Sequence, residues 1–222
     1  MINDFFKNFT KQQELLFKKK IVNNWDYNTV YYLKNKELTQ KKLNEYKQAK
    51  NKERWLLNRN IYQYIDSIIK GWFVEDYIYD ILEKNKIKYE RIGADKRREL
   101  LFDKNMFEKI KGEFDCIIEN NYCDIVSDYT KYCQKNNSIS LNFEKFNKMK
   151  NKNALLLIYD VKNNRVILLN PNIDIYKYKN IKINNIKNAY KKECFYNYKK
   201  HSYDINYFRQ NIKKILKNKA PI

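Results

Sequence analysis

Residues 114–128, FDCIIENNYCDIVSD, contain two apolar runs separated by the polar triplet Glu119-Asn120-Asn121. Both runs contain β-branched residues, which favour strands. Asn tolerates the positive φ that a tight hairpin turn requires, so the triplet can reverse the chain without a glycine. We therefore predict two neighbouring strands that each carry an aspartate, Asp115 on the first strand and Asp124 on the second.

Helical patterns precede this hairpin and further strands follow it. Apolar residues recur at helical spacing over residues 39–58 and 61–82, and Gly71 is expected to mark a break between two helices or a close contact. The other expected elements are strands at 87–92, 138–143, 154–160 and 165–169, and helices at 144–152 and 203–216. This order predicts an α/β (α+β) fold with a central, mostly antiparallel mixed sheet flanked by helices.

The composition excludes several classes of enzyme. The chain has 222 residues, of which 43% are hydrophobic, so it can bury a core. It has only 3 Gly and 2 Pro, and neither a P-loop, nor a Rossmann fingerprint, nor the nucleophile elbow of the α/β-hydrolases occurs in it. With 46 Lys and Arg against 26 Asp and Glu, the net charge is +20, which favours a polyanionic partner.

The positive charge is concentrated at the two ends of the chain. Residues 1–70 carry a net +8 and residues 171–222 a net +10, whereas residues 71–170 carry only +2. We therefore predict a helical basic N-terminal region (1–70), an α/β core (71–170) and a basic Tyr- and Lys-rich C-terminal arm (171–222). A single compact domain is the alternative.

Cysteine usage and hydropathy favour the cytoplasm. The four cysteines form no C-x-x-C pair and have no His at ligand spacing, so we expect reduced thiols rather than zinc ligands. No run of 18 apolar residues occurs, and the first residues lack the pattern of a signal peptide. The expected protein is cytoplasmic, without a membrane segment, and its single histidine, His201, is expected at the surface.

Three acids stand out as candidates for metal binding. Glu75 borders the apolar stripe of the helix at 61–82, and Asp115 and Asp124 lie on neighbouring strands of the hairpin. Converging carboxylates repel one another unless a cation joins them. Mg²⁺ or Mn²⁺ prefers such oxygen ligands and could activate water for phosphodiester hydrolysis. The alternative is that each acid only pairs with a lysine or with backbone donors.

The pattern Gly71-x-x-x-Glu75 on a helix, a strand, then Phe114-Asp115 and the sequence CDIVSD at 123–128 resembles the PD-(D/E)xK nuclease superfamily, in particular type II restriction endonucleases. The resemblance covers roughly residues 71–170. It implies a sheet of restriction-endonuclease-like type, in which Asp115 and Asp124 are the two acids of the motif and Glu75 is the helix-borne acid. It also implies Mg²⁺-dependent cleavage of double-stranded DNA by a homodimer.

One position departs from that motif. The lysine expected two residues after the second acid falls on Val126, which cannot donate a hydrogen bond. Lys131 is a candidate replacement, although its odd offset from Asp124 turns it to the other face of a regular strand. Lys145 or Lys148, on the following helix, could reach back to the site. If none of them does so, the chain is a non-catalytic nucleic-acid-binding protein with a degenerate nuclease-like core.

Basic residues near aromatic ones are candidates for nucleic-acid contacts. Lysine alternates with tyrosine in the stretch YKYK at 176–179, and tyrosines precede lysine pairs further on, so bases could stack there while lysines bind phosphates. A protein-interaction factor whose charge reflects compositional drift is a third possibility. The candidate nucleic-acid-binding residues are Arg97, Arg98, Lys177, Lys179, Lys191, Lys192, Lys199 and Lys200.

Overall fold

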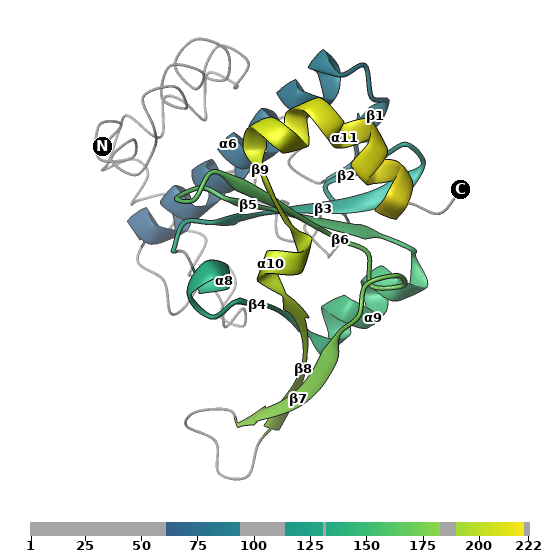
Figure 1. The fold of residues 1–222 in the computed structure, drawn as a ribbon. Coiled ribbons are helices and arrows are strands. Elements are labelled where there is room, and N and C mark those ends of the chain that lie inside the picture. The colour runs from purple at the N-terminus through teal and green to yellow at the C-terminus, as the bar shows by residue number, and fades with distance from the viewer. Residues whose placement is uncertain (1–60, 94–113, 131, 183–189, 220–222) are drawn as a thin grey trace. The chain divides into compact units, whose positions relative to one another are not determined.

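The computed structural model describes residues 61–93, 114–130, 132–182 and 190–219 (Figure 1). The chain divides into two units, Met1–Tyr77 with Arg91–Asp115 and Ile78–Glu90 with Cys116–Ile222. The helix expected at 39–58 lies outside the described residues.

The helices are α6 (Ile61–Lys84), α8 (Tyr132–Lys135), α9 (Phe143–Asn151), α10 (Tyr198–His201) and α11 (Ile205–Lys219). The strands are β1 (Tyr89–Arg91), β2 (Cys116–Ile118), β3 (Asn121–Asp128), β4 (Ser138–Asn142), β5 (Leu155–Asp160), β6 (Arg165–Leu169), β7 (Lys177–Lys182), β8 (Tyr190–Asn197) and β9 (Ser202–Asp204).

A six-stranded mixed sheet with the order β1-β2-β3-β5-β6-β9 forms the centre of the fold. The predicted hairpin is confirmed, because β2 and β3 are antiparallel with Cys116 opposite Cys123. Strands β3 and β5 are parallel, with Asp124 beside Leu156, whereas β6 is antiparallel to both of its neighbours, β5 and β9. A parallel pair needs a crossover connection, which residues 129–154 supply through α8, β4 and α9.

Residues with left-handed backbones close the hairpins. Glu119 and Asn120, with φ of 45° and 69°, connect β2 to β3, and Asn164, with φ of 53°, closes the turn from β5 to β6. Two successive positive φ angles match the twist of a tight hairpin. The prediction that the triplet Glu119-Asn120-Asn121 reverses the chain is therefore confirmed, with Glu119 and Asn120 in the turn and Asn121 already in β3.

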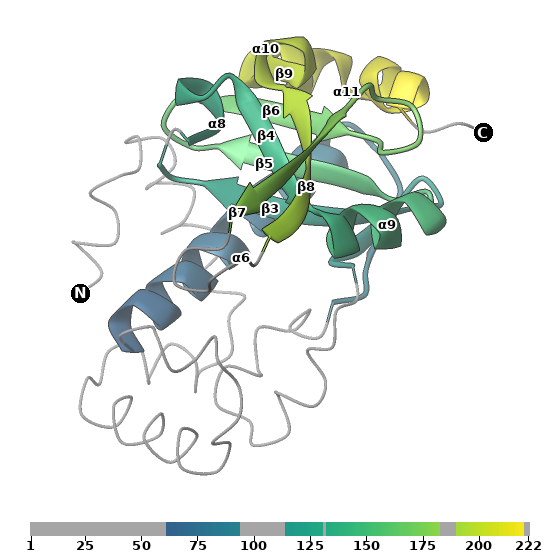
Figure 2. The ribbon, with the colours of Figure 1, turned by 90° about the horizontal axis from the view of Figure 1, so that it is seen from below.

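Helices and a second sheet cover the two faces of the central sheet. Strand β5 is buried along its whole length, from Leu155 to Asp160. Helix α11 packs against β6 and β9 on one face, whereas α9, α10 and the second sheet lie on the other face (Figures 1 and 2). Because side chains alternate along a strand, Asp124 and Val126 share their face with Leu156 and Ile158.

The second sheet has three strands in the order β4-β8-β7. All pairs in it are antiparallel, and Ile139 on β4 lies opposite Tyr196 on β8. Helix α9 packs against β4 and β8. The residues after position 171, expected as a basic arm, thus supply β7 and β8 to this sheet and β9 to the central one. These three strands were not predicted from the sequence.

Helix α6 is continuous from Ile61 to Lys84, so the break expected at Gly71 does not occur. No atom of the described residues lies within 4 Å of a Cβ added at Gly71, so the close contact expected as the alternative does not occur among them. In the same unit, Arg91 forms an ion pair with Asp76 at 3.1 Å. The backbone N–H groups of Ile92 and Gly93 donate to the carbonyl of Asp115 at 3.0 and 3.1 Å.

Candidate functional site

Asp124 and Lys145 form an ion pair between the central sheet and the crossover helix. Asp124 lies in β3, and its Oδ2 contacts Nζ of Lys145 in the first turn of α9. Asn142 caps this helix, because its side-chain oxygen accepts a hydrogen bond from the backbone N–H of Lys145 at 2.7 Å. This cap fixes the position of Lys145 at the start of the helix. The two side chains are 20% and 34% exposed, so an external ligand can approach them.

Lys145 is thus one of the two lysines that were expected to reach back from the helix at 144–152. Val126, at the motif position of the lysine, lies beside Ile158 of β5 and offers no polar atom. Because residues two apart on a strand share a face, Val126 and Asp124 point to the same side of the sheet. The positive charge beside Asp124 therefore comes from a different element of the fold.

Glu75 and Asp115 lie in one unit and Asp124 lies in the other. Glu75 is on α6 and only 8% exposed, which agrees with a position at the border of the apolar stripe. Asp115, predicted on the first strand of the hairpin, instead immediately precedes β2, which begins at Cys116, and it is partly buried. The convergence of these three carboxylates on one site therefore stays a prediction. In the structure, the carboxylate of Asp124 contacts Lys145.

Among the residues that the structure describes, no group of three or more His, Cys, Asp or Glu side chains is arranged to hold a metal ion. The lysine contact also gives Asp124 a cationic partner of its own. The described side chains therefore do not fit a complete Mg²⁺ or Mn²⁺ site by themselves. The need for either metal remains a prediction from the resemblance.

Asp128, at the end of β3, organises the turn that follows it. Its carboxylate accepts hydrogen bonds from the N–H and hydroxyl of Thr130, both at 2.8 Å, and from the N–H of Cys133 at 3.1 Å. Burial opposes ionisation, but these hydrogen bonds outweigh it and lower the pKa of Asp128 below its ordinary value. Burial, followed by this nearby charge, raises the pKa of the Cys133 thiol to about 12. Asp128 therefore has a structural role.

Asp160, at the end of β5, is completely buried and satisfied by hydrogen bonds. It accepts from the N–H and side-chain amide of Asn163 at 3.2 and 2.6 Å, and from the hydroxyl of Tyr198 at 2.9 Å. Buried carboxylates require such partners. Asp160 thus joins the turn between β5 and β6 to α10, and both of its carboxylate oxygens are engaged in this connection.

The predicted nucleic-acid-binding residues of the second sheet and α10 are exposed. Lys177 and Lys179 lie on β7 and Lys192 lies on β8. Lys199 and Lys200 follow on α10, which begins where β8 ends. Arg97, Arg98 and Lys131 lie outside the described residues, as does the side chain of Lys191.

Aromatic rings accompany these lysines. The Nζ atom of Lys192 lies 4.4 Å from the ring centroids of both Phe143 and Tyr178, and that of Lys179 lies 5.4 Å from the centroid of Phe195. Tyr178 is 43% exposed. Exposed rings beside lysines are the combination that binds single-stranded bases and phosphates. Lys177 and Lys179 lie on one face of the second sheet, and Tyr178 and Lys192 lie on the other. We refer to Lys177, Tyr178, Lys179, Lys192, Lys199 and Lys200 together as the basic strip.

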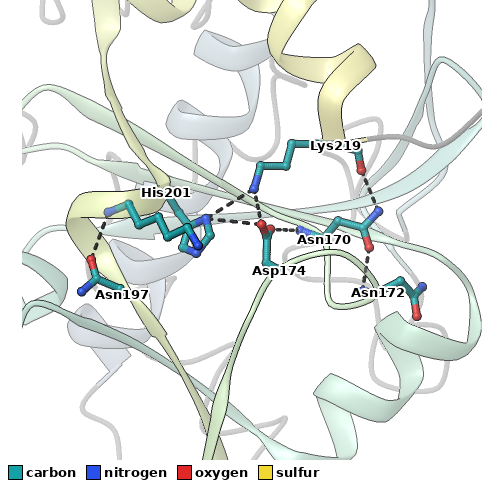
Figure 3. Close-up of polar contacts among 7 residues, drawn as sticks. Asn170, Asn172, Asp174, Asn197, His201 and Lys219 are labelled. Atoms are coloured by element: carbon teal, nitrogen blue, oxygen red, sulfur yellow. Dashed lines mark hydrogen bonds and ion pairs between the residues drawn. The ribbon is translucent and has the colours of Figure 1, made fainter.

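A buried polar network that was not predicted surrounds His201 (Figure 3). His201 is only 2% exposed, so its expected surface position is wrong. Its Nδ1 lies 3.4 Å from Oδ1 of Asp174 and 3.3 Å from Nζ of Lys219, and Lys219 also forms an ion pair with Asp174. The side-chain amide of Asn170 donates to the carbonyl of Lys219 at 2.6 Å, and its backbone N–H donates to Asp174 at 2.8 Å.

The pKa of the histidine in this network lies below its ordinary value. Burial lowers its pKa, Asp174 opposes that effect, and Lys219 and Lys200 add to it. The network joins the turn at 170–174 to α10 and to the end of α11. No local motif marks it, because its members are separated by 18 residues or more along the chain, apart from Asn170 and Asp174.

Comparison with known proteins yields no match: neither a family profile, nor a curated protein, nor a solved structure matches the chain. The four cysteines are all buried, and no disulfide joins them in the structure. Within the described ranges, no helix has the length and apolar character needed to cross a membrane.

Proposed function

We propose that this chain is an endodeoxyribonuclease of PD-(D/E)xK type that hydrolyses phosphodiester bonds in duplex DNA, as type II restriction enzymes do. The contact between Lys145 and Asp124 carries the proposal. It supplies an ammonium group beside the second acid of the motif, where Val126 leaves the usual position apolar. We assign the role of the motif lysine to Lys145.

The order of elements supports the restriction-endonuclease-like assignment. The resemblance runs from a helix through a strand and the Asp-bearing hairpin to a later strand pair. In the fold, α6, β1, the β2–β3 hairpin and the β5–β6 pair follow one another in this order, and all five strands belong to one mixed sheet.

The chemistry assigned to the pair is charge stabilisation and orientation. A phosphodiester gains negative charge in the transition state of hydrolysis, and a positioned lysine stabilises that charge. Asp124 can orient the attacking water through a carboxylate oxygen. Mg²⁺ would supply further charge neutralisation, with Asp115 and Glu75 as the remaining proposed ligands. The described side chains do not form a site for that ion by themselves.

The basic strip is the proposed contact surface for DNA. Its lysines can neutralise phosphates, which dominate the affinity of DNA-binding proteins. Tyr178 can stack on a base or a sugar. Cutting both strands requires two active sites, so the proposal includes a symmetric homodimer.

A nucleic-acid-binding protein that does not cut its ligand is the second candidate. Two observations favour it: Val126 at the motif position and the lack of a three-ligand group among the described side chains. In that case the basic strip would serve binding alone, and the Asp124–Lys145 pair would only anchor α9 to β3.

Incubation of the purified full chain with supercoiled plasmid and Mg²⁺ or Mn²⁺ tests the proposal. We expect nicked and linear products, and a loss of about a hundredfold in rate for Asp124→Asn and for Lys145→Gln. Lys152→Gln, just after the same helix, is the matched control and should cut at the wild-type rate. DNA binding in EDTA should persist in all variants.

The outcomes separate the candidates. Binding of DNA in EDTA without cutting in either metal would select the non-catalytic protein. Neither binding at physiological salt nor cutting would reject both candidates and favour the protein-interaction factor.

A further inference from the structure

A hollow of about 380 Å³ lies between the end of α6 and α11. Figure 1 shows α11 on the side of the central sheet opposite the three-stranded sheet, so the hollow is separate from the basic strip. The side chains that line it are four lysines and three carboxamides, and no acid is among them. They are Lys84, Asn85, Lys86, Gln210, Asn211, Lys213 and Lys214.

The backbone places one of these lysines in a strained position. Helix α6 ends with hydrogen bonds from the N–H of Ile87 to the carbonyl of Leu82 at 3.0 Å and from Lys86 to Glu83 at 2.9 Å. In this type of helix ending the residue at the position of Lys86 is left-handed and usually glycine. Lys86 has a φ of 55°, so the chain keeps a long cationic side chain where glycine would be more stable.

The charges in the hollow are only partly compensated. Lys84 donates to Oδ2 of Asp80 at 2.6 Å. Lys86, Lys213 and Lys214 line the hollow together, and none of the described residues in its wall is acidic. Like charges in one hollow repel each other, and a bound anion would remove that repulsion.

The electric field of the helices does not explain the arrangement. A helix dipole favours cations in the last turn, which accounts for Lys84 at the end of α6. In α11 the last-turn cations are Lys217 and Lys219. Lys213 and Lys214 lie before that turn, and they face the hollow.

We propose that this hollow, the lysine pocket, binds an oligophosphate, that is, two or three linked phosphates of a free nucleotide or successive phosphates of a nucleic-acid strand. Three ammonium groups match the charge of such a group, and the side-chain amide of Gln210 can donate to its non-bridging oxygens. Asn85 and Asn211 each keep a second amide N–H for the same purpose, because each uses one on a backbone carbonyl of its own helix. This site goes beyond the proposed cleavage reaction and does not depend on it.

Calorimetric titration of the full chain with sodium tripolyphosphate at physiological salt tests the site. The pocket variant combines three substitutions, K86Q, K213Q and K214Q. The control variant removes the same charge at exposed positions elsewhere, through K135Q, K162Q and K217Q. We expect the pocket variant to weaken binding at least about tenfold and the control variant to stay within about twofold of the wild type.

Lys86→Gly separates the site from the stability of the fold. This variant should raise the melting temperature, because glycine relieves the left-handed backbone, and it should still weaken the binding of tripolyphosphate. A general loss of structure would lower both quantities.

A competition arm identifies the source of the phosphates. If a short DNA duplex displaces tripolyphosphate from the wild type, the ligand is a nucleic-acid backbone. If ATP displaces it and the duplex does not, the ligand is a free nucleotide. The proposal is overturned if the wild type binds no tripolyphosphate at physiological salt, or if the pocket and control variants lose affinity equally.

Discussion

The carboxylate of Asp128 accepts three hydrogen bonds while it is almost completely buried. These bonds lower its pKa in the folded protein, against the effect of burial. A carboxyl group whose folded pKa lies below the unfolded value, about 3.9, stabilises the fold above that pH. This stabilisation is lost as the pH falls through the folded pKa.

Asp128→Asn should therefore lower the free energy of unfolding at pH 7 by about 1–3 kcal/mol. The difference from the wild type should shrink as the pH falls from 5 toward 3, since the wild-type carboxylate becomes protonated. Urea denaturation across this range measures it, with Glu144→Gln, at an exposed position, as the control. An Asp128→Asn penalty that stays constant with pH would contradict the assigned role.

Single residues also show where sequence reasoning ends. Asn120 and Asn164 could be predicted as turn residues, because Asn is one of the few side chains that tolerate a positive φ. His201 could not be placed, since its burial depends on Asp174 and Lys219, which reach it from other elements. Lys145 could be suggested as a replacement for the motif lysine only because Val126 occupies the position where that lysine is expected.

Helix α6 contains a residue that weakens helices, without an evident need for it. Gly71 lies inside a continuous helix, and an added Cβ would meet no atom of the part of the chain that the structure describes. Gly71→Ala should therefore raise the free energy of unfolding by about 0.5–1 kcal/mol. Urea denaturation checks this, and a decrease would show that the position needs a glycine.

The strands differ in how clearly the sequence pattern indicates them. The strand predicted at 165–169 agrees with β6 in both bounds, because an apolar run lies there between asparagines at 164 and 170. Strands β7 and β8 are rich in Lys, Asn and Tyr, so no alternation of apolar and polar residues marks them. Their pairing with each other and with β4 depends on tertiary contacts.

Helix α9 connects the two sheets and also carries the proposed catalytic lysine. It begins directly after β4 and its chain leads into β5, so the crossover that makes β3 and β5 parallel passes through it. Its cap at Asn142 sets the direction of Lys145 toward β3. The position of this lysine is thus a property of the crossover rather than of the strand motif.

At the scale of the whole molecule, the sequence predicted a mixed α/β fold but not the pairing of its strands. Local patterns locate strands and hairpins, whereas the parallel contact between β3 and β5 joins segments about thirty residues apart. The basic C-terminal residues, expected as an arm, instead complete both sheets. Hence the net charge of +10 after residue 170 lies partly on the basic strip and partly in the lysine pocket.

The central claim is that Lys145 replaces the missing lysine of the nuclease motif. It is tested most directly by comparing the plasmid cleavage rates of Lys145→Gln and of the double variant V126K/K145Q, with circular dichroism to establish that both fold. Val126 shares the face of Asp124, so a lysine there can reach the same carboxylate. We predict that the double variant regains at least about tenfold in rate over Lys145→Gln. A folded double variant that cuts no faster than Lys145→Gln would contradict the claim.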